Sequence, residues 1–319
     1  MKWATEISIP QGAAPLDYQS RIVLMGSCFA THMGERLHYY QFQQTTNPFG
    51  VIFHPAPMAD LVHRALGGKS FESSELFENQ GLWRCSAVHS TLAHPNPERA
   101  LEQLNTALEH LGATLREASH LILTLGTAWG YRDRETGQLV ANCHKRPAAA
   151  FEKELMAPDA LAGVLMGMGI ALRQANPGIR IILSVSPVRH IRDGMVASQR
   201  SKAHLVTAAH QMADAGMGHY FPAYELLVDE LRDYRFYGAD LVHPNEVAVG
   251  HIWERFSGAW VAPGARPVME EVAEVRRGLA HRPLNPESEA HLAFLQSLSR
   301  KMEGLLARYP HMAFENPTS

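Results

Sequence analysis

The chain is poor in cysteine and lacks a disulfide pattern. Its 319 residues include only three cysteines, Cys28, Cys85 and Cys143, and none of them form a C-x-x-C pair. Three cysteines cannot form a complete disulfide set, so we expect a reducing compartment. The N-terminus has no apolar signal core, and no run approaches the roughly 18 apolar residues of a membrane span. The sequence therefore predicts a cytoplasmic protein with no membrane contact.

An excess of positive charge is also lacking. The chain has 29 Lys+Arg against 32 Asp+Glu, a net charge of −3, which makes nucleic acid an unlikely main partner. A hydrophobic fraction of 46% excludes wholesale disorder. What the chain has in excess is histidine, with 18 residues. It has no H-E-x-x-H motif, and Cys143-His144 with Cys85 lacks the tight paired spacing of zinc sites. We therefore predict no metal and no cofactor.

Short apolar strands alternate with longer helical patterns along most of the chain. The strand candidates are residues 21–25, 121–125, 180–185 and 218–221, and the helical candidates are 29–40, 97–111, 158–175 and 198–215. This alternation predicts an α/β fold, a doubly wound parallel sheet with helices on both faces. In such a sheet, a binding site lies at the carboxyl ends of the strands.

The C-terminal part differs from the rest. Residues 268–280 and 287–309 are amphipathic with interleaved charges, which predicts two helices that pack on the sheet domain or on a second subunit. We therefore divide the chain into an N-terminal segment (1–20), a catalytic domain (21–262) and a C-terminal helical extension (263–319). A homodimer through the extension is one expected arrangement.

The first segment that can carry chemistry is Gly26-Ser27-Cys28-Phe29-Ala30, directly after the first strand candidate. A serine on a sharp strand-to-helix turn is exposed at the sheet edge, and the helix N-terminus beside it can stabilise an oxyanion. The simpler interpretation of Ser27 is a helix N-cap. Cys28 is an alternative nucleophile, although a packed thiol is its more common role.

The second such segment is Asp240-Leu241-Val242-His243-Pro244-Asn245. Pro244 suits the first turn of a helix, so His243 lies just before that helix and Asp240 lies three residues upstream. A carboxylate at this distance can hold the imidazole in one tautomer and stabilise its cation. The simpler interpretation is a helix-capping Asp240 beside a surface His243.

Together the two segments resemble the SGNH (GDSL-like) hydrolases. Gly26–Ala30 is the motif of the GSCFA domain family, a group related to them. Other stretches are similar to that family over roughly residues 21–260: Asn47–Gly50, Leu125–Thr127, Asn142–His144, Ser186–Arg189, Ser201–Ala203 and Tyr220–Tyr237. The resemblance implies a flavodoxin-like three-layer sandwich. It also implies Ser27 as the nucleophile, His243 as the general base and Asp240 as the residue that orients it.

The oxyanion site is less complete in this sequence. The SGNH pattern uses a glycine N–H and an asparagine side chain as donors. Gly50 best matches the glycine, and Asn47 beside it is a candidate donor. The third block reads Gly126-Thr127-Ala128-Trp129 and has no asparagine. The hydroxyl of Thr127 or the amide of Asn142 is the candidate replacement.

Three further polar residues are candidates for substrate contact or for structural roles. His144 follows a hairpin expected at residues 131–140, with its turn at Thr136-Gly137, which is either a lid over the site or a surface excursion. Arg189 lies at the end of a strand, where it can bind an anionic substrate group. Its alternative partners are the carboxylates of Asp193 and Glu225. Lys202 begins a helical segment and is expected to be solvated.

These observations predict a serine-dependent acyl-ester hydrolase or O-acyltransferase. Because no apolar lid for a lipid chain is visible, we expect a small-molecule substrate that carries a small acyl group on a polar, carbohydrate-like compound. One alternative is a non-catalytic ligand-binding protein on the same fold, which the missing asparagine favours. A metal-dependent hydrolase is a second alternative.

Overall fold

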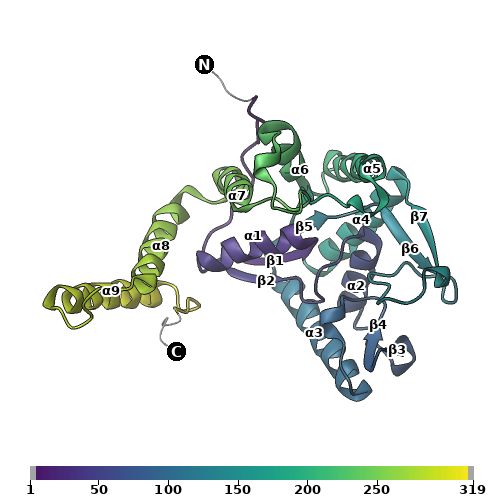
Figure 1. Ribbon diagram of the computed structural model, residues 1–319, viewed down its shortest axis with the longest axis horizontal. Helices are drawn as coiled ribbons and strands as arrows, with labels where there is room; N and C mark the ends of the chain where they lie inside the picture. The colour runs from purple at the N-terminus through teal and green to yellow at the C-terminus, as the bar shows by residue number, and fades with distance from the viewer. Residues whose placement is uncertain (1–4, 315–319) are drawn as a thin grey trace.

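A five-stranded parallel sheet forms the centre of the computed structural model, which describes residues 5–314 (Figure 1). Its strand order is β2-β1-β5-β8-β9. The bounds of these strands are β1 Arg21–Gly26, β2 Gln43–Thr46, β5 His120–Leu125, β8 Arg180–Val185 and β9 His219–Tyr220. Counted along the chain, this is the order 2-1-3-4-5 of flavodoxin-like sheets, so the predicted doubly wound fold is confirmed.

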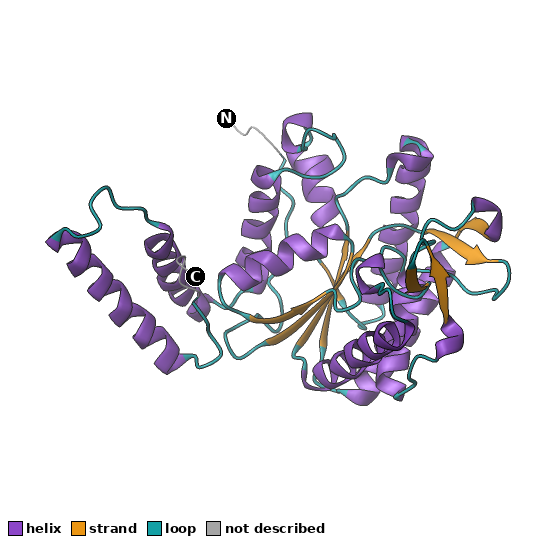
Figure 2. Cartoon of the chain, turned by 60° about the horizontal axis from the view of Figure 1, so that its bottom comes forward, coloured by secondary structure: helices purple, strands orange, loops and turns teal. Residues whose placement is uncertain are grey.

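Helices cover both faces of the sheet (Figure 2). One face packs against α2 (Pro55–Gly67), α3 (Pro97–Glu117), α4 (Pro158–Ala175) and α5 (Met195–Asp214). The other face packs against α1 (Cys28–Tyr39), α6 (Ala223–Glu225), the π-helix Leu226–Leu231 that continues it, and α7 (Glu246–Trp260).

The alternation of side chains in β1 explains the three layers. Val23 and Met25 belong to the hydrophobic core on the α2–α5 side, whereas Ile22 and Leu24 belong to the core on the α1 and α7 side. Successive side chains of a strand point to opposite faces, so a strand buried on both faces is a continuous apolar run. This is why the run R-I-V-L-M predicts β1 well.

The topology places the switch point of the sheet at the carboxyl ends of β1 and β5. These strands are neighbours, and the chain leaves them in opposite directions, toward β2 from β1 and toward β8 from β5. Ligands bind at such switch points in open α/β sheets. Gly26 ends β1 with φ +143°, and a Cβ there would lie 2.1 Å from the carbonyl oxygen of Thr124 on β5. Only glycine therefore allows the tight turn into α1.

Several elements differ from the sequence prediction. The hairpin expected at residues 131–140 is present as a short one: Arg132 bridges Leu139, and Val140 N–H donates to Tyr131 O at 2.9 Å. The pairing of β6 (Trp129–Asp133) with β7 (Phe151–Leu155) has no counterpart in the sequence prediction. Helix α2 has no counterpart among the expected elements, and the proline at its first position begins the helix. A second hairpin, β3 (Leu76–Asn79) and β4 (Leu82–Cys85), has no counterpart among the expected elements.

The C-terminal extension forms an antiparallel helix pair at one end of the domain (Figures 1 and 2). Helix α8 (Arg266–Ala280) and helix α9 (Glu289–Arg308) are joined by the ion pairs Glu274–Lys301 and Glu271–Arg308. Val272 on α8 and Leu305 on α9 extend the core on the α1 and α7 side. The extension therefore packs on the sheet domain, as one of the two expected arrangements requires.

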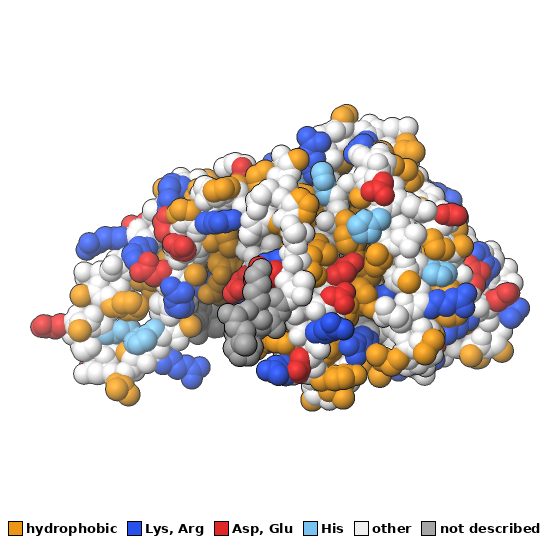
Figure 3. Space-filling view, turned by 90° about the horizontal axis from the view of Figure 1, so that it is seen from above, with side chains coloured by type: hydrophobic (Ala, Val, Ile, Leu, Met, Phe, Trp, Pro, Cys, Tyr) orange, Lys and Arg blue, Asp and Glu red, His pale blue; other side chains and the backbone are white. Residues whose placement is uncertain are grey.

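The surface carries both signs of charge. On the face that Figure 3 shows, Lys and Arg side chains are interspersed with Asp and Glu, as the net charge of −3 leads one to expect. Among residues 5–314, no helix combines the length and apolar character needed to cross a membrane.

Candidate active site

Main-chain hydrogen bonds connect five loops at the carboxyl edge of the sheet. Ile52 N–H, after β2, donates to Gly26 O at 3.0 Å. Gly126 N–H, after β5, donates to Phe53 O at 2.8 Å. Ser186 N–H, after β8, donates to Leu125 O at 2.8 Å. Arg189 N–H then donates to Val242 O at 3.2 Å, which brings in the loop before α7. The segments singled out from the sequence are therefore neighbours in one connected rim.

The turn after β1 presents two different side chains. Ser27 is fully buried, with 0% of its surface exposed, and its Oγ accepts a hydrogen bond from Phe29 N–H at 3.3 Å as the N-cap of α1. Cys28, the first residue of α1, is half-buried. Burial raises the pKa of the Cys28 thiol, and the contact of this thiol with its own backbone N–H opposes that shift. Neither side chain is hydrogen-bonded to His243 within residues 5–314.

The Asp240–His243 pair is already assembled. His243 Nδ1 lies 2.6 Å from Asp240 Oδ2, and the two side chains are 45% and 51% exposed. Asp240 Oδ1 accepts from the backbone N–H groups of Val242 and His243 at 2.9 and 3.0 Å. These bonds, the one to the His243 ring first, lower the pKa of Asp240 to about 2. The carboxylate therefore stays charged at neutral pH and fixes the ring through Nδ1, which leaves Nε2 for proton transfer.

Three of the oxyanion donors suggested by the sequence have partners elsewhere. Asn47 accepts from Gly26 N–H at 2.9 Å through Oδ1 and donates to Thr31 Oγ1 at 3.1 Å through Nδ2. The N–H of Gly50 donates to Asn47 O at 2.8 Å in a tight turn with φ +71° at Gly50. Thr127 Oγ1 lies 3.1 Å from Ser201 Oγ and accepts from Trp129 N–H at 3.0 Å.

Asn142 and His144 form a local turn behind the β3–β4 hairpin. Asn142 Oδ1 accepts from His144 N–H at 2.8 Å. His144 is buried, and its Nε2 lies 2.8 Å from the carbonyl oxygen of Cys85. Burial lowers the pKa of His144, so its ring is neutral at neutral pH. These contacts tie the turn to Cys85, and the Nδ2 of Asn142 has no hydrogen-bond partner within residues 5–314.

Arg189 makes neither of its two expected ion pairs. Asp193 pairs with Lys153 at 2.5 Å, and Glu225 accepts from the hydroxyl of Tyr220 at 2.8 Å. The guanidinium of Arg189 lies instead over the ring of Tyr237, 4.2 Å from its centroid. Within residues 5–314 it has no carboxylate partner. A half-buried cation is therefore available beside the Asp240–His243 loop.

Sequence analysis missed two residues of the rim. Lys202 was expected to be solvated but is fully buried, and its Nζ donates to Gly126 O and Ser186 O. That expectation is wrong because Lys202 falls on the apolar stripe of α5 with Ser198 and Leu205, a helical spacing that was the available signal. His190 contacts the ring of Phe53 edge-on at 5.0 Å. Its pKa is lowered to about 4, by burial first and then by the charges of Lys202 and His243.

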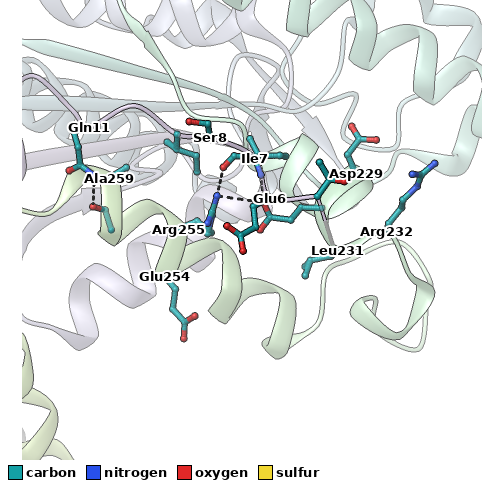
Figure 4. Close-up of a pocket in the computed structure, with 14 residues that line it drawn as sticks. Glu6, Ile7, Ser8, Gln11, Asp229, Leu231, Arg232, Glu254, Arg255 and Ala259 are labelled. Carbon is teal, nitrogen blue, oxygen red and sulfur yellow. Dashed lines mark hydrogen bonds and ion pairs between the residues drawn. The ribbon is translucent and has the colours of Figure 1, made fainter. Parts of the chain in front are cut away.

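One cavity borders the candidate residues, and a larger one lies apart from them. A cavity of about 390 Å³ is lined by Asn47, Gly50, Thr31 and His89, next to the turn after β1. A larger one of about 1240 Å³ lies between the N-terminal segment, the π-helix and α7, where Arg255 reaches the main chain of Ile7 (Figure 4). Its lining residues belong to none of the five loops. No group of three or more His, Cys, Asp or Glu in residues 5–314 is placed to hold a metal ion.

The chain is a doubly wound α/β protein whose carboxyl rim carries a small polar turn after β1 and an Asp–His pair beside the loop after β8. Comparison with family models then gives the family. The GSCFA family matches residues 21–256, and the C-terminal domain of GSCFA domain proteins matches residues 272–317. The chain therefore belongs to the GSCFA family, a loosely SGNH-like group. A search of curated proteins found no match to this chain.

Proposed function

We propose that the protein is an acyl-ester hydrolase or O-acyltransferase that uses a side chain of the Gly26–Cys28 turn as nucleophile and His243 as general base. The observation that carries this proposal is the 2.6 Å contact between His243 Nδ1 and Asp240 Oδ2, in a loop that hydrogen bonds connect to the rim of the switch point. An oriented histidine beside a nucleophile is the common requirement of acyl transfer.

The proposed reaction has two halves. His243 takes the proton of the nucleophile, which attacks the ester carbonyl and forms a tetrahedral oxyanion. His243 then protonates the leaving alcohol as the acyl-enzyme forms. Water or a second alcohol, deprotonated by His243, attacks the acyl-enzyme and releases the nucleophile. Asp240 stabilises the imidazolium in both halves.

Two side chains compete for the role of nucleophile. Family resemblance assigns Ser27, but its Oγ is buried and caps α1, so an ester reaches it only after the turn opens. The greater exposure of Cys28 favours it as the nucleophile. In Gly26-Ser27-Cys28, Cys28 holds the third position, which the serine holds in the G-D-S motif of SGNH hydrolases. As the first residue of α1, Cys28 also experiences the positive end of the helix dipole, which favours a thiolate.

The proposed oxyanion site uses main-chain donors. The backbone N–H of Ser27 donates to Thr124 O at 3.0 Å, whereas that of Cys28 has no oxygen acceptor within residues 5–314 and contacts only its own thiol. Because the N–H of the first residue of a helix points away from the helix body, it can bind an oxyanion on the nucleophile beside it. Thr127 remains a proposed side-chain donor if its hydroxyl exchanges Ser201 for substrate, and Asn142 remains one through Nδ2, which has no partner within residues 5–314.

The proposed substrate is a small acyl ester of a polar, carbohydrate-like compound. The cavity of about 390 Å³ beside Asn47 and Gly50 supports the small size of this substrate, and the hydroxyls of Thr31, Thr46 and Thr91 in its wall are hydrogen-bonded to Asn47, Gln44 and His89. Arg189 is proposed to bind an anionic group of the substrate, because its guanidinium is free of carboxylates in the described chain. His144 stays a weaker candidate contact.

One experiment separates the nucleophiles and tests the function. Ser27→Ala, Cys28→Ala and wild type are assayed on p-nitrophenyl acetate and acetylated sugars, and labelled with a fluorophosphonate and with iodoacetamide. Loss of turnover and of labelling in one variant alone identifies the nucleophile. Because Ser27→Ala also removes an N-cap, worth roughly 1 kcal/mol, Asn96→Ala at the N-cap of α3 is the matched control.

Turnover that survives both substitutions would disprove the proposal. A wild-type protein that binds acetylated sugars without turnover or labelling would instead support a non-catalytic ligand-binding protein, the alternative that the burial of Ser27 favours.

A further inference from the structure

A lysine without a carboxylate partner is buried beneath the site. Lys202 on α5 is 2% exposed, and its Nζ donates to Gly126 O at 2.8 Å and to Ser186 O at 2.7 Å. No carboxylate among residues 5–314 hydrogen-bonds to it. An ammonium group in a dry interior is costly unless hydrogen bonds compensate it, so proteins seldom keep one without a role.

The two acceptors of Lys202 are the ends of neighbouring strands. Gly126 directly follows β5 and Ser186 directly follows β8. Rim residues follow both: Thr127 comes directly after Gly126, and Arg189 and His190 come three and four residues after Ser186. The N–H of Gly126 is also held by Phe53 O, and the Phe53 ring contacts His190. One ammonium group therefore fixes the main chain on both sides of the rim.

The charge of Lys202 also acts on His190. The Nε2 atom of His190 is buried and has no hydrogen-bond partner within residues 5–314. Besides Lys202, the charged or titratable groups that face His190 are His243 and Asp193, and Asp193 is paired with Lys153. Around Lys202 itself lies the ring of Tyr224, with its centroid 5.8 Å from Nζ. A cation under a neutral imidazole disfavours a second positive charge there.

We propose that Lys202 is a positioning residue of this site: its ammonium holds the ends of β5 and β8 in place, and its charge adds to the burial that keeps His190 uncharged, so that of these two histidines His243 exchanges protons. The catalytic consequence of this arrangement depends on the function proposed above, but the consequence for His190 does not.

The test compares Lys202→Met, Lys202→Arg and Lys69→Met with wild type. Methionine removes the charge at similar volume, arginine retains it, and Lys69 is an exposed lysine after α2. NMR titration of the imidazoles should show the pKa of His190 rising by about one unit in Lys202→Met and staying low in the other proteins. In activity assays, Lys202→Met should lower kcat by about tenfold or more with KM changed less than about twofold, and Lys202→Arg should restore part of kcat.

The proposal is overturned if His190 titrates identically in Lys202→Met and wild type. If Lys202→Met does not fold, the ¹⁵Nζ signal of Lys202 in wild type decides: slowly exchanging Nζ protons would show an ammonium held by the carbonyl oxygens of Gly126 and Ser186, and rapid exchange like that of an exposed lysine would contradict it. An inactive wild type would reject the proposed acyl transfer while the NMR results still decide the role of Lys202.

Discussion

Two histidines at the same edge of the sheet have opposite environments. His243 is about half exposed and lies 2.6 Å from a carboxylate that neutralises its charge. His190 is largely buried, contacts an aromatic ring and lies near the cation of Lys202. In the proposed reaction His243 is the proton acceptor, whereas the buried site of His190 disfavours a positive charge. The comparison teaches that the histidine we propose for catalysis is the one left in water beside a carboxylate.

The largest effect that can test this difference is loss of His243. We expect His243→Ala to lower kcat/KM for p-nitrophenyl acetate by a factor on the order of 10²–10⁴, the usual range for a general base. Asp240→Asn should lower it less, because the imidazole remains but loses its fixed tautomer and the stabilisation of its cation.

His110→Ala is the control for this experiment, since His110 is exposed on α3 and its side chain has no assigned role. Equal activity of His243→Ala and His110→Ala would show that His243 is a surface histidine beside a capping aspartate, the simpler interpretation that its sequence context allows.

The sequence predicts those parts of the rim that depend on residues close together in the chain, and it does not predict those that depend on distant residues. The strand 21–25, the turn at Gly26–Phe29 and the pair Asp240–His243 are signalled by local patterns, and the fold follows from the alternation of strands and helices. The edge strand β2, Gln43–Thr46, is polar and has no apolar run to reveal it. β6 pairs with β7 across about twenty residues, and no local turn encodes that partner.

The hydrogen-bond partners of the rim residues are likewise not predictable from the nearby sequence. Nothing near Asn47 in the sequence indicates that its amide bonds to Gly26 and Thr31, and nothing near Lys202 indicates carbonyls 76 and 16 residues away. The spacing of residues in the sequence indicates which of them can carry chemistry. Tertiary packing determines whether their hydrogen-bonding groups are free or already paired.

The next largest effect concerns stability in acid. Burial is the main cause that lowers the pKa of both His190 and His54 to about 4. The unfolded chain, with histidine pKa values near 6.5, therefore binds more protons than the folded chain, and stability should fall as the pH drops from about 6.5 to about 4. Each histidine contributes up to about 3 kcal/mol to this loss.

Urea unfolding at several pH values measures this loss. His54→Asn is a well-matched variant, because asparagine preserves the N-cap of α2 that the Nδ1 of His54 provides but does not titrate. It should reduce the slope of the unfolding free energy against pH, and so should His190→Asn. A slope that only His110→Asn reduces would contradict the assignment.

A smaller effect, at alkaline rather than acidic pH, comes from Lys202. Burial lowers its pKa to about 7, so between about pH 7 and 10.5 the unfolded chain binds more protons and stability should rise with pH. The gain is at most about 1.4 kcal/mol per pH unit for one group. In Lys202→Met this gain should disappear, and in Lys69→Met it should remain. An identical pH slope in all three proteins would mean that Lys202 is solvated.

The smallest expected effect concerns the exposed loop that carries His243. Leu241, between Asp240 and His243, has φ +58°, in the left-handed region, and its side chain is 52% exposed. That conformation costs a branched residue roughly 1–2 kcal/mol, and asparagine tolerates it better. Leu241→Asn should therefore stabilise the protein by about 1 kcal/mol in urea unfolding, with an unchanged m-value.

Leu284→Asn is the matched control for this substitution, since Leu284 is fully exposed and is not among the residues with positive φ. It should leave the free energy of unfolding unchanged. If Leu241→Asn is instead less stable than wild type, the leucine contributes packing that outweighs the strain. If it is more stable but loses activity, the strained turn that Asp240 closes over Val242 and His243 is itself needed to present the His243 ring.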